Sequence, residues 1–191
     1  MIAVEPGALE GVLIFSPKLH RDARGSFQET FILRTYREAG IQEDFVQDNR
    51  SYSATGVLRG LHYQVTQPQG HLVYVTQGKI ADVGLDLRRL SPTFGRWMRV
   101  WLSSEEGRQV YWPPGIAHGY CVVSEGAALQ YKCTDYYRQG DEAGVLWNDP
   151  DLGIEWPMEN PSIDARDAAF PRLKDVPPDR LPRITAHGGG R

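Results

Sequence analysis

Short runs of aliphatic, β-branched and aromatic residues fill the middle of the chain, and turn residues separate them. The runs cover 71–76, 79–87, 96–102, 109–112, 119–123 and 127–134. Between them lie Gln77-Gly78, Ser91-Pro92, Glu106-Gly107, Pro113-Pro114-Gly115 and Glu125-Gly126, which favour turns. Short strands at this spacing, without helical segments between them, are typical of antiparallel sheets. We therefore predict a mainly β fold, a jelly-roll barrel with a few short helices.

Helical periodicity is confined to a few places. The best candidate is Thr30–Ala39, which Gly40 follows as a suitable helix stop. From about Lys174 the sequence is rich in proline, glycine and charged residues, which predicts an irregular tail with disordered last residues. A chain of 191 residues fits one domain, so we expect a single unit over 1–191 that ends in this tail.

The composition argues against several classes of protein. Hydrophobic residues make up 41% of the chain and charged residues 24%, which predicts a packed core. A net charge of -3 provides no general attraction to nucleic acid or anionic membranes. No apolar stretch approaches the roughly 20 residues of a membrane helix, and the first residues lack the basic leader of a signal peptide. Cys121 and Cys133 lie outside any disulfide or metal motif, so we expect two buried thiols in a cytoplasmic protein.

Two segments contain residues that are suited to chemistry. His62 lies in the run Val57–Gln64, three residues after Arg59. In a regular strand these two side chains would point to opposite faces, unless Gly60 marks a bulge that turns one of them. Tyr131 lies in an apolar strand, and its surroundings alone favour a core aromatic over a catalytic residue.

A third segment raises the question of a metal site. Pro114–His118 brings a histidine to the start of a strand through a glycine turn, which matches in outline the second metal-binding box of the cupin barrels. The first box of those barrels, a His-x-His pair followed by glutamate, is missing. His62, His71 and His118 still offer three imidazoles, which suit zinc, iron or nickel. A metal-dependent cupin oxygenase or isomerase is therefore an alternative, whereas the absence of a Walker or Rossmann glycine loop argues against a nicotinamide cofactor.

Nine segments in collinear order resemble the dTDP-4-dehydrorhamnose 3,5-epimerase family, which consists of metal-free cupins. The resemblance begins with FSP at 15–17 and DARGSF at 22–27, and it ends with DARDAAFP at 164–171. Between these lie FVQDNRS at 45–51, GVLRGLHYQ at 56–64, DVGLDLRRLSPTFGRW at 82–97, PPGIAHGY at 113–120, LQYKCTDYY at 129–137 and WNDPDLGIEWP at 147–157. A single such motif would be weak evidence, but nine in order are specific.

This resemblance implies a jelly-roll homodimer whose active site lies inside the barrel and uses neither metal nor cofactor. It assigns His62 as the catalytic base, Asp167 as the carboxylate that orients the base, and Tyr131 as the opposing acid. The residues it assigns to substrate binding are Arg24, Phe27, Glu29, Gln47, Asn49, Arg59, His71, His118 and Tyr137. The implied substrate is dTDP-4-keto-6-deoxy-D-glucose, which is inverted at C3 and C5 to give dTDP-4-dehydro-L-rhamnose.

These residue types suit such a reaction. Removal of a proton beside a ketone needs a base that is active near neutral pH, an acid on the other face, and charge stabilisation at the ketone oxygen. An imidazole is such a base, and a phenol is such an acid. Arg24 and Arg59 suit a diphosphate, because a guanidinium binds phosphate oxygens through two hydrogen bonds. Tyr136 and Tyr137 suit either of two roles, flanking a thymine ring or capping the end of a strand.

One position departs from the family pattern. Where relatives usually carry a lysine, this chain reads Gln69-Gly70-His71. An ammonium there is a fixed positive charge near the substrate carbonyl, whereas an imidazole is cationic only if its surroundings favour protonation. Because His71 replaces this lysine, an enzyme that epimerises C3 or C5 alone is an alternative. A second alternative is a protein that binds the sugar nucleotide without catalysis, but the proposed base and acid would then have no role.

Overall fold

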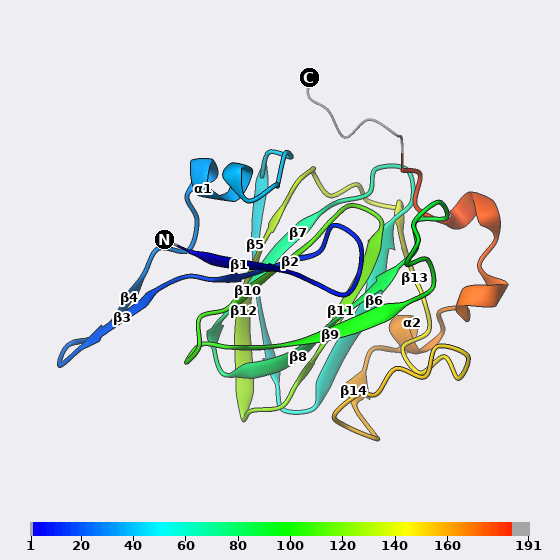
Figure 1. Cartoon of the computed structure of the whole chain (residues 1–191). Coiled ribbons are helices and arrows are strands. Elements are labelled where there is room, and N and C mark those ends of the chain that lie inside the picture. The colour runs from blue at the N-terminus through cyan, green and yellow to red at the C-terminus, as the bar shows by residue number, and fades with distance from the viewer. Residues whose placement is uncertain (1, 185–191) are drawn as a thin grey trace.

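Two facing β-sheets form the core of the computed structural model, which describes residues 2–184 (Figure 1). In the first sheet the order is β1 (Ala3–Pro6), β2 (Leu13–Ser16), β10 (Gln109–Trp112), β7 (His71–Gln77), β12 (Gly126–Cys133) and β5 (Gln47–Ala54). In the second it is β13 (Glu142–Gly144), β6 (Val57–Gln64), β11 (Ile116–Val122), β8 (Lys79–Asp86) and β9 (Trp97–Ser103), with β14 (Ser162–Ile163) beside β6. Within the described residues every pair is antiparallel except that of β14 with β6. The predicted mainly β barrel is confirmed.

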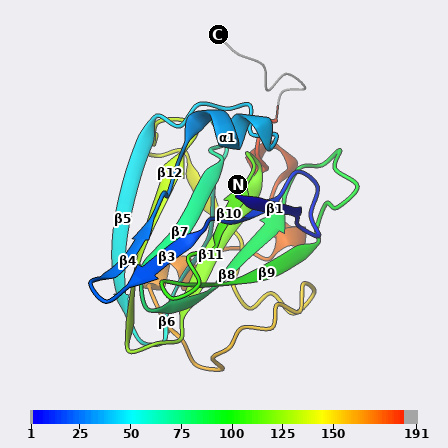
Figure 2. The ribbon, with the colours of Figure 1, turned by 60° about the vertical axis from the view of Figure 1, so that its left-hand side comes forward.

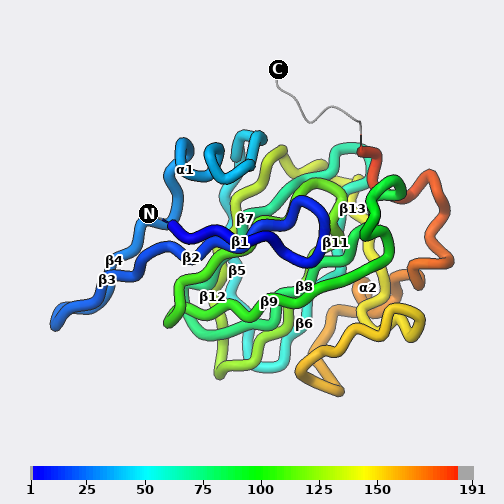
Figure 3. Tube along the Cα trace, viewed as in Figure 1, coloured from blue at the N-terminus to red at the C-terminus, as the bar shows by residue number. Residues whose placement is uncertain are grey.

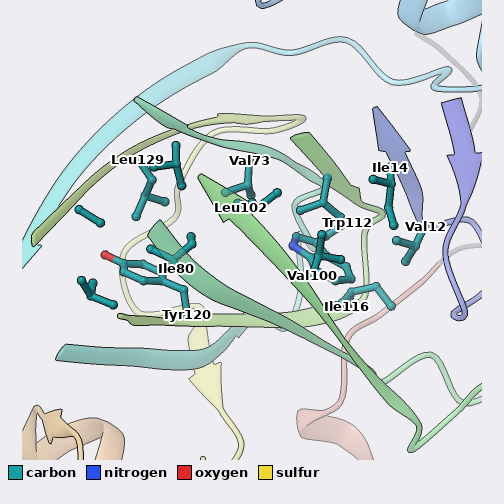
Figure 4. Close-up of a cluster of buried hydrophobic side chains, with 14 of the residues drawn as sticks. Val12, Ile14, Val73, Ile80, Val100, Leu102, Trp112, Ile116, Tyr120 and Leu129 are labelled. Carbon is teal, nitrogen blue, oxygen red and sulfur yellow. The ribbon is translucent and has the colours of Figure 1, made fainter. Parts of the chain in front are cut away.

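Apolar side chains from both sheets fill the space between them (Figure 4). Val73 and Leu129 come from the first sheet, and Ile80 and Leu102 from the second; all are almost completely buried. Trp112, fully buried at the end of β10, belongs to the same cluster. Burial of each such side chain stabilises the fold by about 1.5–3 kcal/mol, so the facing sheets rather than local propensity fix the strands.

The strand boundaries differ from the sequence expectation mainly at β11. This strand begins at Ile116 instead of Gly119, because its whole length pairs with β8, from Ile116 opposite Asp86 to Val122 opposite Ile80. A ladder that long satisfies backbone groups that a shorter strand would leave unpaired.

The helix predicted over Thr30–Ala39 is present but shorter, with about one and a half turns. Helix α1 covers only Leu33–Glu38 and ends just before Gly40, whose φ of 114° suits glycine. Figure 2 shows α1 across one end of the sheets. Tyr36 of this helix is buried there against Phe15 at a ring-centroid distance of 4.5 Å.

The C-terminal part of the described chain packs along the flank of the second sheet (Figure 3). It contains helix α2 (Ala165–Ala168) and two 3-10 helices, Leu173–Asp175 and Pro178–Arg180. Val176 and Leu181 are buried in a second apolar cluster with side chains of β6 and β8, so this stretch has regular turns beyond Lys174. The expectation of disorder concerns residues 185–191, which lie outside the described residues.

A two-stranded hairpin extends away from the sheets (Figure 1). It consists of β3 (Leu19–Asp22) and β4 (Gly25–Gln28), which pair only with each other among the described strands. Phe27 on this hairpin is 66% exposed, which is unusual for a large aromatic side chain in a folded domain.

Two further observations concern the sequence expectations. Cys121 and Cys133 are both buried and free, as expected. Burial raises the pKa of Cys121 to about 11 and that of Cys133 to about 12, so both stay thiols at neutral pH. No helix within residues 2–184 is long and apolar enough to cross a membrane.

Candidate active site

A cavity of about 460 Å³ opens between the two sheets, and both sheets contribute to its walls. Strands β5, β7 and β12 supply one wall, and β6 and β11 supply the facing wall. Of the predicted site residues, those that line it are Gln47, Asn49, Arg59, His62, His71, His118, Tyr131 and Tyr137. Asp167 lies behind His62 and is almost fully buried.

A bulge in β6 turns Arg59 and His62 toward the same cavity. His62 lies opposite His118 and Arg59 opposite Tyr120, so three steps along β6 match two along β11. Gly60 makes the bulge possible: its φ is 121°, and a Cβ there would lie 2.5 Å from the Cα of Gly119. The conditional expectation of a bulge at Gly60 is therefore confirmed.

His62 is held by a buried carboxylate. Its Nε2 lies 2.9 Å from Oδ1 of Asp167, and Oδ2 of Asp167 accepts the backbone N–H of Gly60 at 3.1 Å. Burial alone would raise the pKa of Asp167, but the hydrogen bond and charge of His62, with help from Gly60 and Arg166, bring it below the usual value. Because an ionised carboxylate only accepts hydrogen bonds, Nε2 of His62 carries the proton and Nδ1 keeps a free lone pair.

Tyr131 lies on the facing wall, in β12 of the first sheet. Its ring packs against the main apolar cluster and also lines the cavity. Burial raises the pKa of Tyr131, and the nearby Cys133, Tyr120 and Glu142 raise it further. The side chain is therefore a protonated phenol at neutral pH and can donate a proton into the cavity.

Two more imidazoles lie side by side in the cavity, with ring centroids of His71 and His118 5.8 Å apart. The Nε2 of His118 lies 2.9 Å from the fully buried carboxylate of Asp82, which also accepts the indole N–H of Trp112 at 2.7 Å. Burial, together with the neighbouring His118 and His62, lowers the pKa of His71 to about 3. His71 is therefore neutral at neutral pH and is not the cation that a lysine would be.

The other polar residues of the cavity are linked to one another. Gln47 donates from Nε2 to the Asn49 side chain at 3.1 Å and accepts the backbone N–H of Tyr137 at 3.0 Å. Arg59 donates from Nε to the hydroxyl of Ser53 at 3.1 Å. These bonds hold polar groups in place on both walls of the cavity, as a polar ligand requires.

Three predicted substrate-binding residues lie away from this cavity. Arg24 is at the tip of the hairpin, where its exposed guanidinium pairs with Asp22 at 2.6 Å. Phe27 is exposed on β4 of the same hairpin. Glu29 lines a second hollow, also of about 460 Å³, beside α1 and the N-terminal strand.

Two charged residues of the cavity, Arg166 and Glu142, were not among the predicted site residues. Nη1 of Arg166 pairs with Oε1 of Glu142 at 2.6 Å, and Nη2 lies 3.3 Å from Nε2 of His62. Arg166 also lies 3.2 Å from Asp167. The only signal in the sequence is that Arg166 directly precedes Asp167; the position of Glu142 depends on the pairing of β13 with β6.

The three-imidazole metal site considered from the sequence does not form as a ligand cluster. Within residues 2–184 no group of three or more histidine, cysteine, aspartate or glutamate side chains is arranged to hold a metal ion. His62 and His118 instead direct their Nε2 atoms to separate carboxylates.

Similar proteins are known in sequence and in structure. The family model described as dTDP-4-dehydrorhamnose 3,5-epimerase matches residues 6–175. The dTDP-4-dehydrorhamnose 3,5-epimerase of Shigella flexneri is 48% identical over 167 residues, which cover 86% of this chain and 92% of that protein.

Two solved structures are informative. The dTDP-6-deoxy-D-glucose-3,5-epimerase of Legionella pneumophila, in complex with dTDP-4-keto-L-rhamnose, is 44% identical, with a TM-score of 0.93 and coverage of 97% of this chain and all of that one. A 3'-monoepimerase from Streptomyces bikiniensis, in complex with dTDP-quinovose, is 35% identical, with a TM-score of 0.83 over 88% of this chain and 87% of that one. With the family model and the close relative in agreement, the chain belongs to the dTDP-4-dehydrorhamnose 3,5-epimerase family.

Proposed function

We propose that this protein inverts C3 and C5 of dTDP-4-keto-6-deoxy-D-glucose and so forms dTDP-4-dehydro-L-rhamnose, without a cofactor. One observation carries the proposal: a carboxylate-held imidazole, His62, and a phenol, Tyr131, line one cavity from facing sheets. The substrate class is supported by the Legionella pneumophila relative, which binds dTDP-4-keto-L-rhamnose.

His62 removes the proton from the carbon beside the ketone. Its Nδ1 lone pair takes the proton, and the electrons of the C–H bond move into an enolate whose charge rests on the ketone oxygen. The imidazolium formed in this step is stabilised by Asp167, 2.9 Å away and almost fully buried. Solvent then takes the proton from His62, and the base is ready for the second carbon.

Tyr131 returns a proton to the opposite face of the same carbon. As the enolate collapses to the ketone, the carbon takes the phenolic proton and its configuration inverts. A single base would return the proton to the face from which it came. Because burial raises the pKa of Tyr131, the phenol holds its proton until the enolate forms and is then reprotonated from solvent.

The rest of the cavity suits a nucleoside diphosphate. The guanidinium of Arg59 is a bidentate donor for phosphate oxygens. Tyr137 is 49% exposed, so its ring is free to stack on a thymine, and its backbone is anchored to Gln47. Asn49 and the Gln47 amide supply neutral hydrogen bonds nearby.

The proposal includes a homodimer in which hairpin β3–β4 of one protomer completes the cavity of its partner. The hairpin extends from its own sheets and exposes Phe27 and Arg24, two residues assigned to substrate binding. A partner's cavity gives both side chains a role that their own cavity does not. We also propose a cytoplasmic location, since two free thiols are typical of a reducing compartment.

The test is proton exchange in heavy water. NMR of the wild-type protein with dTDP-4-keto-6-deoxy-D-glucose should show one deuterium at C3 and one at C5 of the product. His62→Ala should abolish both, and exchange that persists in this variant would contradict the proposal. Deuterium at C3 or C5 alone would establish the second candidate, a mono-epimerase, which the similarity to the Streptomyces bikiniensis 3'-monoepimerase favours.

A further inference from the structure

The three imidazoles of the cavity have different hydrogen-bond partners. His62 and His118 each direct Nε2 to a buried carboxylate at 2.9 Å, Asp167 and Asp82 respectively. His71 has no carboxylate partner among residues 2–184, and its Nδ1 is buried there without any hydrogen-bond partner. Two of the rings are therefore held in one tautomer by a carboxylate, and the third is not.

This difference decides what each neutral ring can offer a ligand. In neutral His62 and His118 the single N–H is used by the carboxylate, so the other nitrogen is an acceptor. A ketone oxygen is also an acceptor, so neither ring can bind it without first gaining a proton. Neutral His71 has no such restriction and can present an N–H to the cavity.

The burial of Nδ1 indicates which nitrogen of His71 carries that proton. A buried N–H without an acceptor is rarer in proteins than a buried acceptor without a donor. With Nδ1 buried and unpartnered, the proton belongs on Nε2, the remaining nitrogen of a ring that lines the cavity. Tyr131 packs edge-on to this ring, with centroids 5.7 Å apart, so the ring of His71 is next to both the proposed acid and His118.

From this geometry we infer that His71 is the neutral electrophile of the site, donating Nε2–H to the substrate carbonyl oxygen as the enolate forms. The inference rests on the proposed epimerase function and deepens it. The titratable neighbours of the ring include His118 on β11, His62 on β6, and Tyr131 and Cys133 on β12. None of these is an anion that would hold a proton on His71. A neutral donor stabilises the developing charge without placing another cation beside the imidazolium of His62.

Substitutions at His71 test the inference through the rate of deuterium exchange in saturating substrate. His71→Leu should lower kcat about 100-fold and leave KM within about threefold, because the lost hydrogen bond forms in the transition state. His71→Gln, whose amide can donate, should recover at least a tenth of the wild-type kcat. Gln77→Leu, at the exposed far end of the same strand, should behave as wild type.

The outcomes separate this inference from the proposed function. Exchange in the wild type with an equally fast His71→Leu variant would overturn the inference alone, whereas no exchange in the wild type would overturn the epimerase function. A glutamine variant as slow as the leucine variant would also count against a donor role.

A measurement on the unaltered protein covers the case in which the variants fold poorly. Nitrogen-15 NMR of labelled histidines, with dTDP bound, should show His71 as the neutral Nε2–H tautomer from pH 6 to pH 8. An imidazolium signal or the Nδ1–H tautomer for His71 in that range would overturn the inference.

Discussion

Replacing Asp167 by asparagine tests whether the carboxylate sets the tautomer of His62. The new amide fills the same space but has one acceptor and one donor end. Oδ2 accepts the buried backbone N–H of Gly60, and leaving that donor unpaired would be costly, so the amide oxygen should take this place. The amide NH2 then faces Nε2 of His62. The neighbouring guanidinium of Arg166 does not prevent this orientation, because the Arg166 side chain is 57% exposed and can turn toward water.

The expected loss follows from this orientation. An NH2 group opposite Nε2 forces that nitrogen to accept, which moves the ring proton to Nδ1 and removes the lone pair that takes the substrate proton. The same tautomer change in a serine-protease triad costs roughly 10⁴-fold in kcat. We expect a similar loss here, equivalent to about 5.5 kcal/mol in the activation free energy.

The assay is kcat for deuterium exchange, with dTDP affinity measured by calorimetry as a control on binding. Affinity should change little, because Asp167 is buried behind His62. Asp164→Asn is the matched control: Asp164 is the exposed N-cap of the same helix, and asparagine caps equally well. An Asp167→Asn protein that keeps more than a tenth of the wild-type kcat would refute the tautomer argument.

Two further predictions concern stability. Gly60→Ala should lower Tm by about 10 °C, because a Cβ would meet the Cα of Gly119 at 2.5 Å. Gly140→Ala is the control: Gly140 also has a positive φ but open space around it, so this variant should lower Tm much less. Similar Tm values for the two variants would contradict the bulge argument. Burial raises the pKa of Asp86, but hydrogen bonds from Arg88, Ser91 and Thr93 lower it by more, so the folded-state pKa lies below the usual value. The ionised carboxylate therefore stabilises the fold at neutral pH, and this contribution is lost as pH falls below about 4. In Asp86→Asn, thermal unfolding from pH 7 to pH 3 should show a weaker acid dependence, and an unchanged slope would contradict this.

The barrel was predictable because its strands alternate with strong turn signals. Each run between the turns is apolar enough to be buried between sheets, and β10 matches its predicted range. The start of β11 was not predictable, since the ladder with β8 fixes it. Helix α1 was not predictable in its extent either, since it spans only Leu33–Glu38.

The site was predictable where a local rule applied. A glycine between Arg59 and His62 indicated a bulge, and the bulge places both in one cavity. The charge state of His71 depends on burial and on rings from other strands, which no local pattern encodes. Arg166 and Glu142 come together only through the fold, which pairs β13 with β6.

The central claim is that His62 and Tyr131 act on opposite faces of the sugar. The most direct measurement is the stereochemical course of exchange in heavy water by Tyr131→Phe, followed by NMR, with Tyr74→Phe as a control whose hydroxyl bonds Gln130 instead. The account predicts that Tyr131→Phe loses inversion at least 100-fold and that any deuterium it incorporates enters with retained configuration. Inversion at the wild-type rate would contradict it.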